Sequence, residues 1–368
     1  MKILQLIYES FGSPFGFGGA GVRAYEIYKR LKAQHDITFL CMKYPGAIDG
    51  EIFGLKHIFV GAGSKRLTRN VFSYTVKAAE YVKKFGDNFD VIIENFLPAT
   101  PFFSKFLTRT PVILQIQGLW GLHYVKKFNV FYGLPMYVME KIYLKLYNTF
   151  ILVTDVNMNK VIRRSEKCAI IPNGIDREFL RVNNEEDDYI LFLSRIDIYQ
   201  KGLDILVDAF RLIAEKFKDL RLVLAGYAFS NVDDLMKRIP VGLRDRINYV
   251  GFVSGEEKLR LLSKAKAFVL PSRLEAHPVS VLEALACGKA VLVSDIPELR
   301  YIIENDVGLT FKNNSSRDLA DKLSVLLKDK GLRHTIGEKG RRFAFNYLWD
   351  DMALVFELFL KEVVSGQA

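Results

Sequence analysis

Short apolar runs alternate with amphipathic segments along the whole chain of 368 residues. The runs, rich in Val, Ile, Leu and Phe, are typical of strands buried on both faces, and the segments between them have the 3.6-residue period of helices. This alternation predicts parallel sheets covered by helices on both faces, an α/β fold. The predicted strands are residues 2–8, 37–42, 91–94, 112–115 and 150–154 in the first half, and 189–194, 220–225, 247–250, 267–270 and 290–293 in the second.

Two comparable series of strands and helices predict two Rossmann-like domains with a cleft between their sheets, and the length of the chain agrees. Turn and polar signals at Pro172-Asn-Gly-Ile-Asp176 and at 183–188 indicate the boundary. We expect an N-terminal domain over 1–177 and a C-terminal domain over 178–348. Apolar residues at helical spacing predict a final helix over 349–368. From its pattern alone, this helix closes the second domain or packs back on the first.

The net charge of +10 resides in the first half of the chain. Residues 1–177 hold 24 Lys and Arg against 13 Asp and Glu, a balance of +11, and no acidic residue occurs between Glu94 and Glu140. This excess predicts an acidic partner, such as anionic lipid headgroups, a phosphorylated acceptor or nucleic acid. The alternative is a basic, solvated face that only aids solubility.

The sequence contains no secretory signal and no apolar stretch of transmembrane length. Its three cysteines, Cys41, Cys168 and Cys287, are far apart and lack metal-ligand spacing. We therefore expect a reduced, cytoplasmic protein.

A glycine-rich loop over 12–21 follows the first strand and precedes a helix predicted over 22–31. Glycines such as Gly18 and Gly19 permit close backbone approach to a ligand, and a helix N-terminus favours a phosphate. The loop matches neither G-x-G-x-x-G nor a P-loop. The alternative is a loop that merely turns sharply.

A second candidate is the segment 194–202, after the first strand of the second half and before a helix predicted over 203–217. Its cations Arg195 and Lys201 suit a diphosphate whose negative charge grows as it leaves. The alternative is a solvated basic loop.

The third candidate is a pair of carboxylates, Glu275 and Glu283, eight positions apart at a strand-to-helix junction. Glu275 is expected on the loop at the carboxyl edge of the sheet, and Glu283 about one turn into a helix that Gly288 ends. Ligands of open α/β sheets bind at that edge, and the amides that open the helix suit an anion. One acid can face a reacting centre while the other grips a distal part of the same ligand. The alternative is a surface glutamate followed by one that favours the helix dipole.

Taken in order, these motifs resemble the retaining GT-B glycosyltransferases of family 4, the glycosyl transferases group 1 with a Glu-x7-Glu motif. The blocks that agree are Gly18-Gly19-x-Gly21, Ile171-Pro-Asn-Gly-Ile-Asp176, Ser194-Arg195 with Lys201-Gly202, Leu224-Ala-Gly226 with Val250-Gly251-Phe252, and Glu275-x7-Glu283 with Ala286-Cys-Gly288. Trp349 at the head of the final helix also agrees, because in this family that helix crosses back to the N-terminal domain.

The resemblance implies transfer of a hexose from a nucleotide-diphosphate sugar with retention of anomeric configuration. It implies no cofactor and no metal, and the chain contains no Asp-x-Asp. The expected catalytic residues are Glu275, Arg195 and Lys201. The donor nucleotide and its phosphates would be bound by Gly18, Gly19, Arg195, Lys201, Val250 and Glu283, with Glu283 on the ribose and Val250 near the base. The donor sugar would be met by Glu275, His277, Pro278, Val279, Ser280 and Gln117.

The chain departs from the family pattern at three places, and one of them is Leu224-Ala-Gly226-Tyr, which lacks the second glycine that often follows. Gln117 stands where a histidine is common, and His123 follows six residues later. His123 either reaches the acceptor side of the same cleft or is an ordinary loop histidine. The sequence Ala276-His277-Pro278 replaces the usual aromatic-Gly, which bears on the choice of donor sugar more than on the reaction class.

Aromatic and basic residues are mixed over 102–106, 124–132 and 137–147 in the first half. This composition suits an anionic membrane surface, so we expect a lipid-linked or other glycan acceptor and a cytoplasmic protein placed peripherally at the inner membrane face, with no nucleic acid partner. The alternative is an aromatic core with bases outside. Rival functions are a nucleotide-sugar epimerase or phosphorylase of the same fold, or a non-catalytic sugar- or RNA-binding relative.

Overall fold

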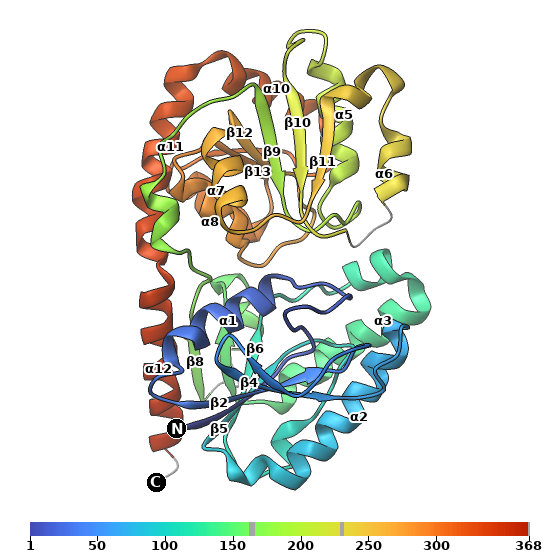
Figure 1. Ribbon diagram of the computed structural model, residues 1–368, viewed down its shortest axis with the longest axis vertical. Helices are drawn as coiled ribbons and strands as arrows, with labels where there is room; N and C mark the ends of the chain where they lie inside the picture. Colours follow the sequence, from blue (N-terminus) through green and yellow to red (C-terminus); the bar gives the residue numbers. More distant parts are fainter. Residues whose placement is uncertain (162–165, 229–231, 367–368) are drawn as a thin grey trace. The chain divides into compact units, whose positions relative to one another are not determined.

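The computed structural model describes residues 1–161, 166–228 and 232–366 (Figure 1). The chain forms two compact units. The N-terminal unit comprises Met1–Asn173 with Trp349–Ala368, and the C-terminal unit comprises Gly174–Leu348. Both are α/β units built on a largely parallel sheet, as the alternation of apolar and amphipathic segments predicts.

The N-terminal unit contains an eight-stranded sheet in its described part, in the order β3-β4-β2-β1-β5-β6-β7-β8. Its strands are β1 (Lys2–Leu6), β2 (Asp36–Met42), β3 (Gly50–Ile52), β4 (Leu55–Val60), β5 (Val91–Asn95), β6 (Val112–Ile116), β7 (Thr149–Leu152) and β8 (Lys167–Ile170). The described strand pairs are parallel, as predicted, except at one edge, where β3 pairs antiparallel with β4. Phe53 and Gly54 both have positive φ in the turn that joins them, which is the backbone of a tight hairpin.

Helices cover both faces of this sheet. They are α1 (Gly19–Leu31), α2 (Leu67–Phe85), α3 (His123–Leu146), α4 (Met158–Val161) and α12 (Trp349–Ser365). Side chains of α2 and α3, such as Tyr74 and Tyr143, pack with Leu4 and Leu6 of β1 in one core. On the other face, the Tyr28 hydroxyl of α1 donates to Gln5 of β1.

The final helix α12 packs against α1 within the N-terminal unit (Figure 1). The Phe356 ring meets Tyr28 edge-on at 5.7 Å, and Glu357 Oε1 lies 2.9 Å from His35 Nε2. Of the two placements that the helical pattern leaves open, the chain adopts the one that the family resemblance implies. The helix was predicted over 349–368, and residues 367–368 lie outside the described part.

The C-terminal unit contains a parallel six-stranded sheet in the order β11-β10-β9-β12-β13-β14, again counted over its described residues. The strands are β9 (Tyr189–Leu193), β10 (Arg221–Ala225), β11 (Ile247–Gly251), β12 (Ala267–Leu270), β13 (Val291–Ser294) and β14 (Leu309–Phe311). Its helices are α5 (Leu203–Ile213), α6 (Val232–Arg238), α7 (Gly255–Lys264), α8 (Val279–Ala286), α9 (Tyr301–Glu304), α10 (Ser316–Lys328) and α11 (Lys330–Ala344). The strand order reverses between β9 and β12, so the topological switch point of the sheet, where such folds bind ligands, lies there.

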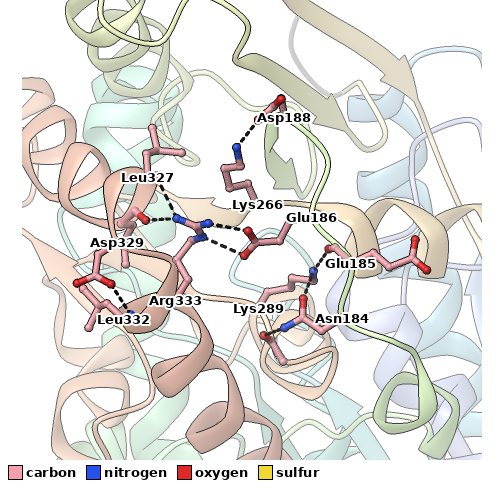
Figure 2. A network of polar contacts seen from close by, with 12 residues as sticks. Asn184, Glu185, Glu186, Asp188, Lys266, Lys289, Leu327, Asp329, Leu332 and Arg333 are labelled. Atoms are coloured by element: carbon pink, nitrogen blue, oxygen red, sulfur yellow. Dashed lines mark hydrogen bonds and ion pairs between the residues drawn. The ribbon is translucent and has the colours of Figure 1, made fainter.

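The polar segment 183–188 is held within the C-terminal unit by a network of ion pairs and hydrogen bonds (Figure 2). Arg333 binds both carboxylate oxygens of Glu186, at 2.9 and 2.6 Å. Lys289 Nζ donates to Asn184 Oδ1 and to the Glu185 carbonyl, and burial lowers the pKa of Lys289 to about 8. Segment 183–188 is therefore anchored, and the two units divide earlier in the chain, between Asn173 and Gly174.

Candidate functional site

Two loops meet at the switch point of the C-terminal unit, one after β9 and one after β12. Gly202 closes the first loop with φ +65°, and a Cβ there would lie 2.0 Å from the Pro271 carbonyl oxygen of the second. The loop after β10 approaches equally closely, because a Cβ on Gly226 would lie 1.8 Å from the Ser194 carbonyl oxygen. Only glycine permits these contacts, so both positions are required for bringing the three strand ends together.

A buried ion pair joins the first two loops. Lys201 Nζ lies 2.5 Å from Glu275 Oε1, and the Ser272 hydroxyl donates to the same oxygen at 2.6 Å. Both charged side chains are buried. A buried charge requires such a partner and further hydrogen bonds to offset its desolvation. The structure thus brings together two of the three predicted catalytic residues.

Arg195, the third, is half-buried on the same loop as Lys201. Its Nη2 donates to Gln200 Oε1 at 3.0 Å, and the backbone N–H of Gln200 donates to Asp197 Oδ1 at 2.9 Å. Asp197 and Gln200 are both buried. These two polar side chains therefore fix the loop that carries both cations, a role that the spacing of the cations does not indicate.

Arg273 fastens the loop after β12 to the one after β9. Its amide donates to the Gln200 carbonyl at 2.8 Å, and its guanidinium binds both carboxylate oxygens of Asp204, at 2.9 and 2.7 Å. Bidentate pairs of this kind impose orientation as well as attraction. Arg273 opens the motif that the sequence singles out, but nothing in the sequence indicates its partner.

Glu283 lies in the second turn of α8, as predicted, and forms a different ion pair. Its Oε1 lies 2.6 Å from Lys258 Nζ of α7. The Glu283 side chain is buried. Gly288, with φ +69°, follows the helix as expected for a helix-ending glycine. Lys258 is a further residue that sequence reasoning missed, since a lysine on an amphipathic helix carries no signal of a buried partner.

The start of α8 supplies backbone groups to the same sheet edge. Pro278 is the N-cap without a side-chain hydrogen bond, and Val279 and Ser280 are the first two helical residues. The backbone N–H groups at these first helical positions have no carbonyl partner within the helix. The His277 imidazole packs between the rings of Tyr301 and Tyr347, at 5.5 and 5.6 Å, so it lies within an aromatic cluster.

Val250 occupies the carboxyl end of β11, two strands from β9, with an exposed side chain. It therefore lies at the edge of the C-terminal sheet that also carries Arg195, Lys201 and Glu275.

The glycine-rich loop belongs to the N-terminal unit, where α1 begins at Gly19, three residues earlier than predicted. Its opening amides are bound by the buried carboxylate of Glu9, which accepts from Gly18 N at 3.0 Å and Gly21 N at 2.7 Å. A Cβ on Gly21 would lie 2.8 Å from Glu9 Oε2, so any larger residue here would collide with the carboxylate. Apart from its two chain neighbours and the backbone of its own helix, no described atom lies within 4 Å of the place of a Cβ on Gly19. Gly19 therefore leaves room for a ligand.

Gln117 and His123 also lie in the N-terminal unit. Gln117 follows β6 and is half-buried, and His123 is the first residue of α3. Gln117 Nε2 and His123 Nδ1 are buried atoms without a hydrogen-bond partner in the part of the chain that the structure describes. Burial, aided by the nearby charge of Lys126, lowers the pKa of His123.

Comparisons with known proteins agree with the fold and the motifs. The family profile "Glycosyltransferase Family 4" matches residues 17–179, and "Glycosyl transferases group 1" matches residues 176–343. The chain belongs to this group of GT-B glycosyltransferases, and it is a transferase enzyme.

One similar protein is the N,N'-diacetylbacillosaminyl-diphospho-undecaprenol alpha-1,3-N-acetylgalactosaminyltransferase of Campylobacter jejuni. It is 29% identical over 265 residues, which are 67% of this chain and 68% of the relative. Among solved structures, sucrose-phosphate synthase from Thermosynechococcus elongatus superposes with a TM-score of 0.80 and 20% identity over 99% of both chains. HepE of Anabaena, in complex with UDP and glucose, has a TM-score of 0.76 and 18% identity over 98% of this chain and 100% of its own.

Within residues 1–161, 166–228 and 232–366, no helix combines the length and the apolar character needed to span a bilayer.

Proposed function

We propose that this glycosyltransferase moves a hexose from a nucleoside-diphosphate sugar to a lipid-linked or other glycan acceptor, with retention and without a divalent metal. The observation that carries this proposal is the cluster of Lys201, Ser272 and Glu275 beside Arg195 at the switch point of the C-terminal sheet. Ligands of open α/β folds bind at such a point.

The two cations supply what a departing diphosphate requires. Arg195 is held by Gln200, and Lys201 by Glu275, so neither side chain must be ordered when the donor binds. Positive charge fixed before the reaction stabilises the developing negative charge of the leaving group. In the proposed mechanism this charge takes the part that a metal ion plays elsewhere.

The carboxylates have separate tasks in the proposal. Glu283, oriented by Lys258, accepts hydrogen bonds from the ribose hydroxyls. Glu275 lies by the donor sugar together with the backbone at Val279 and Ser280, and Gln117 offers its amide to the same sugar. Val250 lies near the base. Gly18 and Gly19 approach the diphosphate, and His123 serves the acceptor side.

The comparisons support the choice of substrates. HepE is bound to UDP and glucose, which supports a nucleotide-sugar donor. The name of the Campylobacter relative specifies an acceptor linked to undecaprenol through a diphosphate. Such an acceptor is anionic and resides in a membrane, and the basic N-terminal unit suits both properties. We therefore place the enzyme in the cytoplasm, peripherally at the inner membrane face.

The proposal is tested by incubating the protein with UDP-, GDP- and ADP-hexoses in EDTA, with an undecaprenyl-diphosphate-linked sugar as acceptor. Release of free nucleoside diphosphate reports transfer, and proton NMR of the product gives the anomeric configuration. A product with the donor's configuration supports the proposal, and an inverted product contradicts it. An isomerised donor with its nucleotide intact indicates an epimerase, and a sugar 1-phosphate formed with inorganic phosphate indicates a phosphorylase. Donor binding without turnover of any of these substrates favours a non-catalytic relative.

A further inference from the structure

Helix α3 of the N-terminal unit is divided by a sharp elbow at Asn129 (Figure 1). Asn129 has φ 64° and ψ 177°, which a helix cannot continue through. Its side-chain oxygen accepts hydrogen bonds from the amides of Phe131 at 3.0 Å and Tyr132 at 3.3 Å. Asn129 therefore ends the first arm of α3, residues 123–128, and caps the second arm, residues 130–146.

The two arms of the elbow are in direct backbone contact. A Cβ on Gly133 would lie 2.4 Å from Val125 Cα and 2.5 Å from the Tyr124 carbonyl oxygen. Only glycine permits this approach, so the elbow has a defined geometry.

The base of the elbow is fastened to the rest of the N-terminal unit. The buried Glu140 accepts from the amides of Trp120 at 2.9 Å and Gly121 at 3.3 Å. Further along the second arm, the hydroxyls of Tyr143 and Tyr147 both donate to the buried Glu94 of β5. The elbow is thus held firmly while its tip projects.

The tip exposes apolar side chains. Phe131 is 87% exposed, Tyr132 64% and Leu134 47%. Val138 and Ile142, four and eight residues after Leu134, continue the exposed apolar stripe along the second arm. A contiguous exposed apolar surface on an anchored element marks an interaction site.

The charge around the stripe restricts the partner. Lys126, Lys141 and Lys145 are exposed on α3, and residues 95–139 contain no acidic side chain. The nearest carboxylate in sequence, Glu140, is buried within the base of the elbow. A partner must therefore combine negative charge with an apolar interior, as an anionic bilayer does.

We infer that the α3 elbow docks on an anionic bilayer, with Phe131, Tyr132 and Leu134 inserted at the boundary between headgroups and acyl chains. The helix follows β6 and Gln117, so docking brings the carboxyl edge of the N-terminal sheet to the lipid. The purpose of the docking, access to a lipid-linked acceptor, rests on the proposed function.

The test is flotation with vesicles of phosphatidylcholine alone or mixed with phosphatidylglycerol. We expect binding to the anionic vesicles that weakens as salt is raised, because salt screens the headgroup charge. Phe131→Glu combined with Leu134→Glu should lower the partition coefficient by about tenfold or more. The matched control is Leu212→Glu combined with Val241→Glu, which adds the same charge at exposed apolar positions of the C-terminal unit and should bind as the wild type does.

A second variant tests the charge separately. Lys141→Gln combined with Lys145→Gln removes two bases without disturbing the apolar tip, and should weaken binding severalfold and flatten its salt dependence. Failure of the wild type to bind anionic vesicles, or equal binding by the Phe131 and Leu134 variant, would overturn the inference. A wild-type dimer in sedimentation that the same variant abolishes would assign the tip to a second copy of this chain instead.

The same variants separate this inference from the proposed function. The elbow variant should bind nucleoside diphosphates in solution as tightly as the wild type, because its substitutions lie outside the donor residues. Vesicle binding without sugar transfer from any donor would contradict the proposed function alone. Transfer to a lipid-linked acceptor by a protein that does not bind vesicles would contradict the docking alone.

Discussion

Lys201 and Glu275 lie 74 positions apart in the sequence, yet the ammonium of one stands 2.5 Å from the carboxylate of the other. The contact joins the loops that follow β9 and β12, the two strands at which the sheet order reverses. Ser272 donates to the same carboxylate oxygen, so the pair is hydrogen-bonded as well as charged. Together with the pair between Arg273 and Asp204, this interaction holds together the two loops to which we assign the chemistry.

Stability should reveal the coupling of this pair. Lys201→Met leaves a buried carboxylate without its cation, and breaking one partner of a buried pair costs about 3–5 kcal/mol. In a double-mutant cycle with Glu275→Gln, the coupling energy should be about 1–3 kcal/mol. The measurement is the urea transition of the unit that carries each pair, the C-terminal unit for Lys201 and the N-terminal unit for the control. The exposed pair Lys77 and Glu80 provides the control, with a coupling of about 1 kcal/mol at most. Equal coupling in the two cycles would contradict the burial of the Lys201 pair.

Turnover should depend on Glu283 and on its partner in different ways. Glu283→Ala and Lys201→Ala should each lose most turnover. Lys258→Met should mainly raise KM for the donor, by about tenfold, because it frees the Glu283 carboxylate from the orientation in which it meets the ribose. Lys264→Met, on the same helix, is the control and should change neither constant. A fall in kcat with an unaltered KM for Lys258→Met would contradict a positioning role.

Alanine substitutions at Gly19 and Gly21 of the glycine-rich loop should have different effects on stability. Gly19→Ala meets no described atom within 4 Å and should leave the thermal midpoint unchanged or raise it, while weakening nucleoside diphosphate binding. Gly21→Ala should destabilise the N-terminal unit, because its Cβ would lie 2.4 Å from Phe17 and 2.8 Å from Glu9. Gly242→Ala, at another open position, controls for the added methyl. Unaltered nucleotide binding by Gly19→Ala would remove Gly19 from the donor site.

Helix α12 should contribute to the stability of the N-terminal unit through its buried face. Phe356→Ala removes a buried ring that packs on Tyr28 and should cost about 3–5 kcal/mol. Leu358→Ala, on the exposed face of the same helix, should change stability by about 0.5 kcal/mol or less. Chemical denaturation of the two variants checks the difference. Similar losses for both would show that the helix packs on another face.

Acid should weaken the N-terminal unit through His57. This histidine is buried against Phe39, its Nε2 lies 2.5 Å from the Tyr25 hydroxyl, and burial lowers its pKa. Below pH 6.5 the unfolded chain therefore binds more protons than the folded one, so the free energy of unfolding falls as the pH falls. Between pH 6.5 and 5.5 the loss from this residue is at most about 1.4 kcal/mol.

The pH dependence is measured by urea denaturation from pH 7.5 to 5.5, in the wild type, His57→Gln and, as a control, the exposed His334→Gln. The slope of the free energy of unfolding against pH should become smaller only in His57→Gln. An unchanged slope in that variant would show that other groups account for the acid sensitivity.

Much of the fold follows from periodicity. Each of the ten predicted strands matches a strand of the structure with ends that differ by at most two residues. The strands β3, β4, β8 and β14 were not predicted. Three of them are short edge strands, and β4 is interrupted by the exposed Lys56 and by His57, so none forms the continuous apolar run of a central strand.

The rest depends on contacts between residues far apart in the sequence. The start of α1 at Gly19 is fixed by the carboxylate of Glu9, and no local pattern announces that carboxylate as a cap. The motifs predicted that Glu275, Lys201 and Glu283 would lie at one sheet edge, but not that Lys258 would bind Glu283.

The mixed aromatic and basic segments of the first half are a further case in which the sequence pattern did not predict which side chains are buried. Phe102, Tyr124 and Tyr147 are core residues, whereas Phe131 and Tyr132 are exposed. The turn of the backbone at Asn129 separates the part of α3 that carries Tyr124 from the part that carries Phe131 and Tyr132, and composition alone does not indicate this turn.

Calorimetric titration with UDP, GDP and ADP in EDTA tests the central claim most directly, because it needs no acceptor. The proposed site predicts that one of the three nucleotides binds the wild type without metal, and that Lys201→Met weakens this binding by about tenfold or more. It also predicts that Lys264→Met binds as the wild type does. No binding of any nucleotide, or equal binding by wild type and Lys201→Met, would contradict the assignment of the donor site.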